Sequence, residues 1–353
     1  MKKYIIYFAS VIFISLSACK KDKKDDPSPA PSSDSVLVDF ASVLAKPNYG
    51  DLKNKAAFLN EAIDSLNSNP NSVTLAAAQQ AWRDVRIPWE MAEGYLIGPA
   101  VDYEYDPSTD SWPVNTTDLD SLLNSTNPLE LSDIDQLQFT LKGYHAIEYI
   151  LFGVGGTRTA AELNARKLKY VVSLSESVFN ITSDLVSSWD VYAVDLSTAG
   201  IGSSRYSTRK AAFLEIVGAM QGICNEVANN KMETPLVNLD STGVESQYAH
   251  NATIDFINNI IGIENAYFCR YNGVYGKSIH DMVHSINAQL DNQIQNQITA
   301  SINALQTLYA VEPNYGLAIF NQQGQIFTVQ HTIRDLKNQL DQLTNFVEEN
   351  ITN

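Results

Sequence analysis

Residues 132–152 read SDIDQLQFTLKGYHAIEYILF, and their pattern is the clearest indication of the fold. The apolar residues recur at steps of three and four, which is the period of one face of an α-helix. The members of that face are Ile134, Leu137, Leu141, His145, Glu148 and Phe152. The spacing therefore predicts a buried helix face on which His145 and Glu148 lie about one turn apart.

The same helical period runs through most of the chain. It predicts helices over residues 52–67, 72–97, 132–152, 160–188, 207–232, 246–270, 277–309 and 327–350. No sustained alternation of apolar and polar residues indicates strands. Two long segments without this period, 98–118 and 189–206, are of the kind that carries function or joins domains. We therefore predict an all-α fold in which two helical bundles, residues 36–190 and 205–353, pack together.

Ionisable side chains are unusual on a buried helix face. Charged groups are seldom buried unless they are paired or bind a metal ion, and imidazole with carboxylate is a common ligand set for zinc and iron. His145 and Glu148 therefore predict a metal site, and Gly143 beside them permits a close backbone approach. The alternative is a His–Glu hydrogen bond that ties two helices together without an ion.

The predicted helix 72–97 also carries a carboxylate on its apolar face. Glu93 replaces an apolar residue near the C-terminal end, where the helix dipole does not stabilise a negative charge. It needs a partner, which could be Arg86, although Arg86 could instead pair with Glu90. We expect Glu93 to bind the metal or line its site, with Arg86 beside it. Asp102 in the following loop is close enough in sequence to Glu93 to reach the same pocket.

In the second half, residues 245–267 form an apolar helical stretch with a polar stripe. Asp255 and Asn259 share one face of this stretch, and His250 lies on another. Buried Asn and Asp side chains need hydrogen-bond partners. They either satisfy backbone groups of the long loops or line a cleft between the bundles, so all three are site-lining candidates.

The N-terminus looks like a lipoprotein signal. Lys2 and Lys3 precede a short apolar run that ends in Leu16-Ser17-Ala18-Cys19, and that run is too short to span a bilayer comfortably. We predict a signal peptide over residues 1–19 with lipidation at Cys19, since a diacylated cysteine gives stable anchoring. Residues 20–35 are rich in charge, Pro and Ser, which is typical of a tether. The expected location is the bacterial envelope, at the outer membrane.

The overall charge restricts the partners. Lys and Arg number 24 against 40 Asp and Glu, a net charge of −16 at pH 7. This balance argues against nucleic acid and is compatible with cations. Cys224 and Cys269 lie in apolar helical stretches, where they either pair or remain buried thiols.

Residues 143–148, GYHAIE, resemble the GxHxxE motif of imelysin-like proteins, and YILFG after them is similar too. The stretches AWRDVRIPWEMAEGYLIGPAVD and DSWPVN, which contains Trp112, are similar to segments of that family's first domain. GICNEVANNKMETPL and ESQYAHNATIDFINNI resemble segments of its second domain. The resemblance covers about residues 36–350. It implies two four-helix bundles, a site near their junction with His145 and Glu148 in a metal role, an envelope location and a link to iron uptake.

Three functions remain open. The first is a lipid-anchored metal-binding protein that handles iron, or binds zinc, beside envelope transport proteins. The second is a metallopeptidase, because the family was classed with peptidases. No HExxH occurs, and Tyr149 stands where the inverted HxxEH motif needs histidine, so a third ligand would come from His250, Glu93 or Asp102. The third is a partner-binding module whose polar cleft holds a peptide or glycan without metal.

Overall fold

The computed structural model describes residues 31–352. The predicted signal peptide and Cys19 lie outside the described residues, as does most of the predicted tether. The last residues of that tether are helical, because helix α1 (Ser33–Asp39) starts within it. Its N-cap is Ser32, whose side chain accepts a hydrogen bond from the backbone N–H of Ser35.

The elements that precede residue 200 are helical. They are α1, the π-helix η1 (Phe40–Ala45), α2 (Lys46–Ser68), α3 (Ser72–Glu93), α4 (Pro99–Asp102), α5 (Tyr105–Asp110), α6 (Thr116–Asn124), α7 (Leu131–Ile134), the 3-10 helix η2 (Phe139–Leu141), α8 (Gly143–Phe152), the 3-10 helices η3 (Val154–Gly156) and η4 (Ala160–Glu162), and α9 (Ala165–Ser197). Thr159 and Glu162 form a capping box at the start of the short η4.

The second half is also helical apart from one small hairpin. Its elements are α10 (Arg209–Asn225), the π-helix η5 (Glu226–Lys231), α11 (Glu233–Asn238), the 3-10 helix η6 (Ser241–Gly243), α12 (Ala252–Phe268), β1 (Arg270–Tyr271), β2 (Val274–Tyr275), α13 (Ile279–Ile286), α14 (Ala288–Val311), α15 (Tyr315–Asn321) and α16 (Gln323–Asn350). The hairpin is antiparallel, with Arg270 opposite Tyr275.

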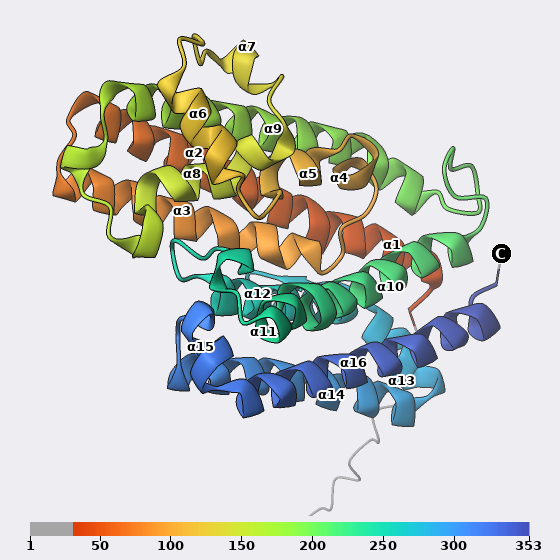
Figure 1. The fold of residues 1–353 in the computed structure, drawn as a ribbon. Coiled ribbons are helices and arrows are strands. Elements are labelled where there is room, and N and C mark those ends of the chain that lie inside the picture. The colour runs from red at the N-terminus through yellow and green to blue at the C-terminus, as the bar shows by residue number, and fades with distance from the viewer. Residues whose placement is uncertain (1–30, 353) are drawn as a thin grey trace, which may run out of the picture.

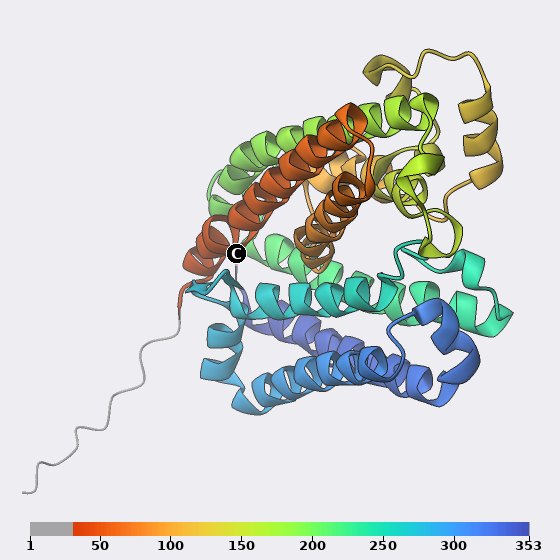
Figure 2. The same cartoon turned by 90° about the vertical axis from the view of Figure 1, so that its left-hand side faces the viewer.

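The long helices form two layers, one above the other in Figure 1. In the first layer α2 packs against α3 and α9, and in the second α16 packs against α10 and α14. Helix α12 packs against both α3 and α14, so it joins the layers, as Figure 2 also shows. The predicted all-α fold of packed helical bundles is confirmed. Among residues 31–352, no helix combines the length and apolar character needed to cross a membrane.

Two glycines allow α3 and α12 to approach closely at the layer junction. A Cβ added to Gly94 would lie 2.4 Å from the carbonyl carbon of Gly262, and a Cβ on Gly262 would lie 2.1 Å from the carbonyl oxygen of Met91. Any larger residue at either position would separate the two backbones. The C-terminal turns of α3, which hold Glu90 and Glu93, are therefore pressed against α12.

The prediction of one helix over 132–152 is wrong in its first half. α7 ends at Ile134 and α8 begins only at Gly143. Lys142 is extended and Gly143 has a φ of 78°, so the backbone turns sharply into α8. Ile134 and Leu137 therefore do not extend the face of His145. The burial of that face is nevertheless as predicted, because every residue of α8 is buried.

The other differences concern helix boundaries. The predicted helix 277–309 divides at Asn287, whose side chain caps the N-terminus of α14. The segment 98–118, predicted as irregular, contains α4 and α5, and α9 continues to Ser197 inside the segment predicted as 189–206. Cys224 and Cys269 are both buried and free.

Candidate functional site

Buried ionisable side chains gather where α3, α5, α8, η5 and the segment before α12 meet. The carboxyl groups of this junction cluster are Glu90, Glu93, Asp110, Glu148, Glu245 and Asp255, and its basic side chains are Arg86, His145 and Lys231. All are buried, and the most exposed of them, Glu93, is 7% exposed. Charges withdrawn from water are stable only with close partners, so the contacts within the cluster determine its chemistry.

Glu148 fixes the orientation of His145. The Nδ1 atom of His145 lies 3.0 Å from Oε2 of Glu148. The other oxygen of Glu148 accepts hydrogen bonds of 2.8 Å from the backbone N–H groups of Tyr248 and Ala249. A carboxylate only accepts, so Nδ1 carries a proton in either charge state of the ring, and Nε2 has a free lone pair once the ring is deprotonated. Both oxygens of Glu148 already accept hydrogen bonds. Of the two side chains, only His145 therefore has an atom free to bind a metal ion, its Nε2.

Gly143 brings Asp110 to that nitrogen. A Cβ on Gly143 would lie 2.2 Å from the carbonyl oxygen of Thr109, so only glycine lets the end of α5 meet the start of α8. Asp110 Oδ1 consequently lies 3.1 Å from His145 Nε2. The contact lacks the alignment of a hydrogen bond, and Nε2 has no hydrogen-bond partner among the described residues. Gly143, the first residue of the GxHxxE motif, therefore brings the carboxylate of Asp110, which is distant in sequence, to His145.

Arg86 is the central cation of the cluster. Its guanidinium donates to Glu90 and Asp110 and lies 3.4 Å from Glu245 and 3.6 Å from Asp255. The sequence left open whether Arg86 pairs with Glu93 or with Glu90, and Glu90 is its partner. Four carboxylates, from α3, α5, the segment before α12 and α12 itself, are therefore held around one side chain.

Lys231, which no helical pattern singled out, is the partner of Glu93. Its Nζ lies 2.9 Å from Glu93 and 3.1 Å from Glu245, and its side chain is fully buried. Lys231 is the last residue of η5, a π-helix, and such irregular turns are often found at functional sites. The sequence offered no clear signal for it, because Lys231 follows Asn229 and Asn230 in a polar part of the predicted helix 207–232.

Asp255 and Asn259, for which the polar stripe left two roles open, both lie in the junction cluster. Asp255 accepts hydrogen bonds from Ser246 and Asn251. The amide of Asn259 donates to Glu90 at 2.7 Å and to Glu93 at 2.8 Å. Glu245 was missed because it lies in the irregular segment before α12, where no helical period marks it as buried.

Carboxyl groups outnumber basic groups in the junction cluster, and their pKa values shift in different directions. Burial acts to raise the pKa of Asp110, but the neighbouring Arg86 and His145 outweigh it and lower that pKa. Burial raises the pKa of Glu245 to about 8, and burial also raises the pKa values of Glu90 and Asp255. Burial lowers the pKa of His145, but the neighbouring Asp110 and Glu148 outweigh it and raise that pKa to about 9. A bound metal cation could take the place of these protons.

The donors are close enough for a metal. One ligand atom from each of Asp110, His145 and Glu245 lies within 4.8 Å of the others, and a second such group is Glu90, Glu93 and Asp110. His145 Nε2 is 3.1 Å from Asp110 and 3.9 Å from Glu245. Donors of a tetrahedral zinc site are about 3.4 Å apart, given metal–ligand bonds of about 2.1 Å. The first group therefore needs only small shifts to enclose an ion.

Trp112 lines the approach to His145 and Glu148. Together with Tyr248 and neighbouring residues it bounds a cavity of about 10 Å³ beside these two side chains. That volume is about the room needed for one water molecule.

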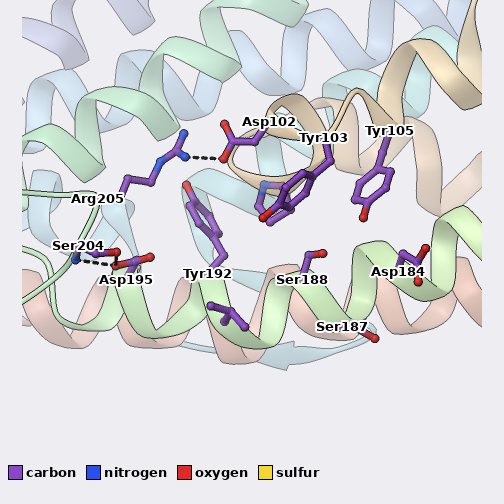
Figure 3. A pocket seen from close by; sticks show the side chains of 12 residues that line it. Asp102, Tyr103, Tyr105, Asp184, Ser187, Ser188, Tyr192, Asp195, Ser204 and Arg205 are labelled. Carbon is purple, nitrogen blue, oxygen red and sulfur yellow. Dashed lines mark hydrogen bonds and ion pairs between the residues drawn. The ribbon is translucent and has the colours of Figure 1, made fainter.

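Asp102 and His250 do not join the cluster. Asp102 pairs with Arg205 at the surface, in a pocket of about 510 Å³ that Tyr103, Tyr105 and Tyr192 also line (Figure 3). His250 is exposed and lies beside Gly156. The expectation that Asp102 reaches the pocket of Glu93 is wrong, because α4 turns it toward the loop after α9.

The fold and the junction cluster together define an all-α protein of two packed bundles with a buried histidine–carboxylate site between them. The family model described as Imelysin matches residues 45–343, and the chain belongs to the imelysin family.

Relatives with the same fold have been described. The chain is 28% identical over 314 residues to the iron-regulated protein A of Synechococcus elongatus, and the match covers 84% of each. A crystal structure of an iron-regulated protein A precursor from Parabacteroides distasonis is 27% identical, covers 92% of this chain and 96% of its own, and has a TM-score of 0.80. An imelysin-like protein from Psychrobacter arcticum shares the fold, with a TM-score of 0.67 at 14% identity over 89% of this chain and 92% of its own.

Proposed function

We propose that the junction cluster binds a metal ion, iron or zinc, through His145, Asp110 and Glu245, and that the protein handles iron in the bacterial envelope. The main support is a pair of buried atoms without hydrogen-bond partners in the described chain, His145 Nε2 and Glu245 Oε2. Leaving such atoms unpaired costs about 1–3 kcal/mol each. An ion bound between them would remove that cost and offset part of the excess negative charge.

In this proposal Glu148 and Glu93 support the site. Glu148 holds the ring of His145 by Nδ1 and so acts as a positioning carboxylate, as is common behind metal-bound imidazoles. Glu93 is occupied by Lys231 and Asn259 and acts as a neighbour of the ligands. Arg86 and Lys231 hold the remaining carboxylates in place.

The link to iron rests on the relatives, two of which carry the name iron-regulated protein A. The envelope location rests on the lipoprotein-like signal that ends at Cys19. A lipid-anchored protein with a buried cation site could pass iron to, or receive it from, envelope transport proteins.

The test is metal content and affinity in purified protein. We expect about one Fe²⁺ or Zn²⁺ per chain by calorimetry and elemental analysis, and at least a tenfold weaker affinity in His145→Ala and in Glu245→Gln. His331→Ala is the matched control, because His331 is 76% exposed and lies on α16. Equal metal binding by wild type and both site variants would refute the proposal.

The site favours metal binding over peptide hydrolysis. A peptidase needs an open position for substrate beside its metal and water, whereas the cavity beside His145 and Glu148 is about 10 Å³. The partner-binding alternative would instead use the surface pocket of Figure 3, which the exposed Tyr103 lines together with the ion pair of Asp102 and Arg205.

A further inference from the structure

A second histidine–carboxylate cluster lies at the corner between α13 and α14, in the second layer (Figure 1). His280 and His284 are four residues apart on α13, and both contact Asp291 on α14. His280 Nδ1 lies 2.6 Å from Oδ1 of Asp291, and His284 Nδ1 lies 2.8 Å from Oδ2. We call these three residues the α13 site.

The carboxylate of this site is fully buried, whereas its histidines reach water. The side chain of Asp291 is 0% exposed, against 26% for His280 and 59% for His284. Tyr267 and Gln295 also donate to Asp291, at 2.9 Å and 2.7 Å. Asp291 is therefore held rigidly from inside the protein and presents one oxygen to each imidazole.

This arrangement fixes the tautomer of both rings. A carboxylate can only accept a hydrogen bond, so each Nδ1 carries the proton and each neutral ring keeps a lone pair on Nε2. No hydrogen bond to either Nε2 is found among the described residues. Imidazoles bound to transition metals usually donate their second nitrogen to a carboxylate in this way.

The separation of the rings suits a shared ion. Their centroids are 5.7 Å apart. Metal–nitrogen bonds of about 2.1 Å place two imidazole centroids about 5–6 Å apart around one ion, depending on the ligand angle. His280 also packs against Phe268, with centroids 4.9 Å apart, which restricts its ring.

We propose that the α13 site binds a divalent transition-metal ion through Nε2 of His280 and Nε2 of His284, with water completing the coordination. Two imidazoles suit Zn²⁺, Cu²⁺ and Ni²⁺. The site lies on a different pair of helices from the junction cluster and shares no residue with it, so the inference does not depend on the proposed function.

The experiment is a Zn²⁺ titration of the purified protein with ¹³C-labelled histidine, observed by NMR. The chain has five histidines, so single His→Gln variants assign every imidazole signal. We expect the signals of His280 and His284 to shift together and saturate at one ion per site. His284→Gln should abolish the shift of His280, and Asp291→Asn should weaken Zn²⁺ binding about 10–100-fold.

His331 provides the matched control. It lies on a helix, is exposed and contacts a carboxylate, Asp335 at 2.9 Å, but has no second histidine beside it. If His331 or His250 responds at the same Zn²⁺ concentration as His280, binding is that of any surface imidazole and the proposal is wrong. Independent responses of His280 and His284 would also overturn it. The signal of His145 reports the junction cluster separately, so failure of one site is distinguished from failure of the other.

Discussion

Two histidine–carboxylate clusters in the described part of the chain, the junction cluster and the α13 site, lie in opposite surroundings. In the junction cluster His145 is 2% exposed, and six buried carboxyl groups surround it and two other basic side chains. In the α13 site the carboxylate of Asp291 is buried, but His284 has a side chain that is 59% exposed. The junction cluster therefore depends on the packing of both layers, whereas the α13 site depends on two adjacent helices.

The two surroundings shift the pKa values of Glu245 and Asp291 in opposite directions. Burial dominates for Glu245 and raises its pKa to about 8. Burial also acts to raise the pKa of Asp291, but hydrogen bonds from His280, His284 and Tyr267 outweigh it and lower that pKa. A buried carboxylate thus keeps its charge where donors converge on it, and its pKa rises where burial outweighs the neighbouring cations, as at Glu245.

The largest effect is expected from Arg86→Met. This change removes the cation between Glu90 and Asp110 and leaves buried carboxylates without a partner. Losing one member of a buried ion pair costs about 3–5 kcal/mol. The free energy of unfolding, measured by urea titration, should fall by that amount.

Lys169→Met is the control for Arg86→Met. Lys169 pairs with Glu130, but their side chains are 42% and 61% exposed. Exposed pairs contribute about 0–1 kcal/mol. If the two substitutions destabilise the protein equally, the buried network around Arg86 is not what holds the junction together.

A smaller but still large effect is expected from Gly143→Ala. Both the positive φ and the contact with Thr109 oppose a side chain there, and we expect a loss of about 2–4 kcal/mol. Gly155 has a similar φ of 73° but nothing within 4 Å of an added Cβ, so Gly155→Ala isolates the backbone strain at about 1 kcal/mol. Chemical denaturation of both variants measures the difference in their free energies of unfolding. Equal losses of stability would show that the close contact between α5 and α8 does not require glycine at position 143.

These residues also show what the sequence could predict. The helical period and the buried placement of His145 and Glu148 are both confirmed, because α8 is buried on every side and its pattern is local. The continuation of that helix back to residue 132 was wrong, since a glycine with positive φ interrupts it and periodicity does not report dihedral angles.

The partners of His145 could not be predicted in the same way. Asp110 and Glu245 come from short or irregular segments, and their positions depend on close backbone contacts at Gly143, Gly94 and Gly262. Such contacts are set by tertiary packing, which spacing along the chain does not encode. Asp102 was the nearer carboxylate in sequence to Glu93, yet α4 directs it to Arg205 instead.

The pH dependence of stability should distinguish the two clusters. The pKa of His145 is raised to about 9, so the stability it contributes is present below about pH 6.5 and is lost as the pH rises toward 9. Glu245, with its pKa raised to about 8, acts in the same direction. Without metal, we expect the free energy of unfolding to fall by about 1–3 kcal/mol between pH 6.5 and 9. His145→Gln should flatten this fall.

Asp291 should affect the stability of the protein at acidic pH, the opposite end of the pH range. Because its pKa is lowered, its contribution is present above the usual aspartate pKa and is lost as the pH falls below about 4. Asp291→Asn should therefore change the acid limb of the stability profile and leave the alkaline limb unchanged. A change on the alkaline limb would mean that the two clusters are coupled.

The smallest effect is expected from His284→Gln in the absence of metal. The imidazole of His284 is largely exposed, and Asp291 keeps its bonds from His280, Tyr267 and Gln295. The free energy of unfolding should change by less than about 0.5 kcal/mol. His145→Gln should cost about 1–3 kcal/mol, because Glu148 then loses its buried imidazole donor. Thermal unfolding of the two metal-free variants measures this difference in stability. If His284→Gln destabilises the protein as much as His145→Gln does, the histidines of the α13 site stabilise the fold and are not free to bind a metal ion.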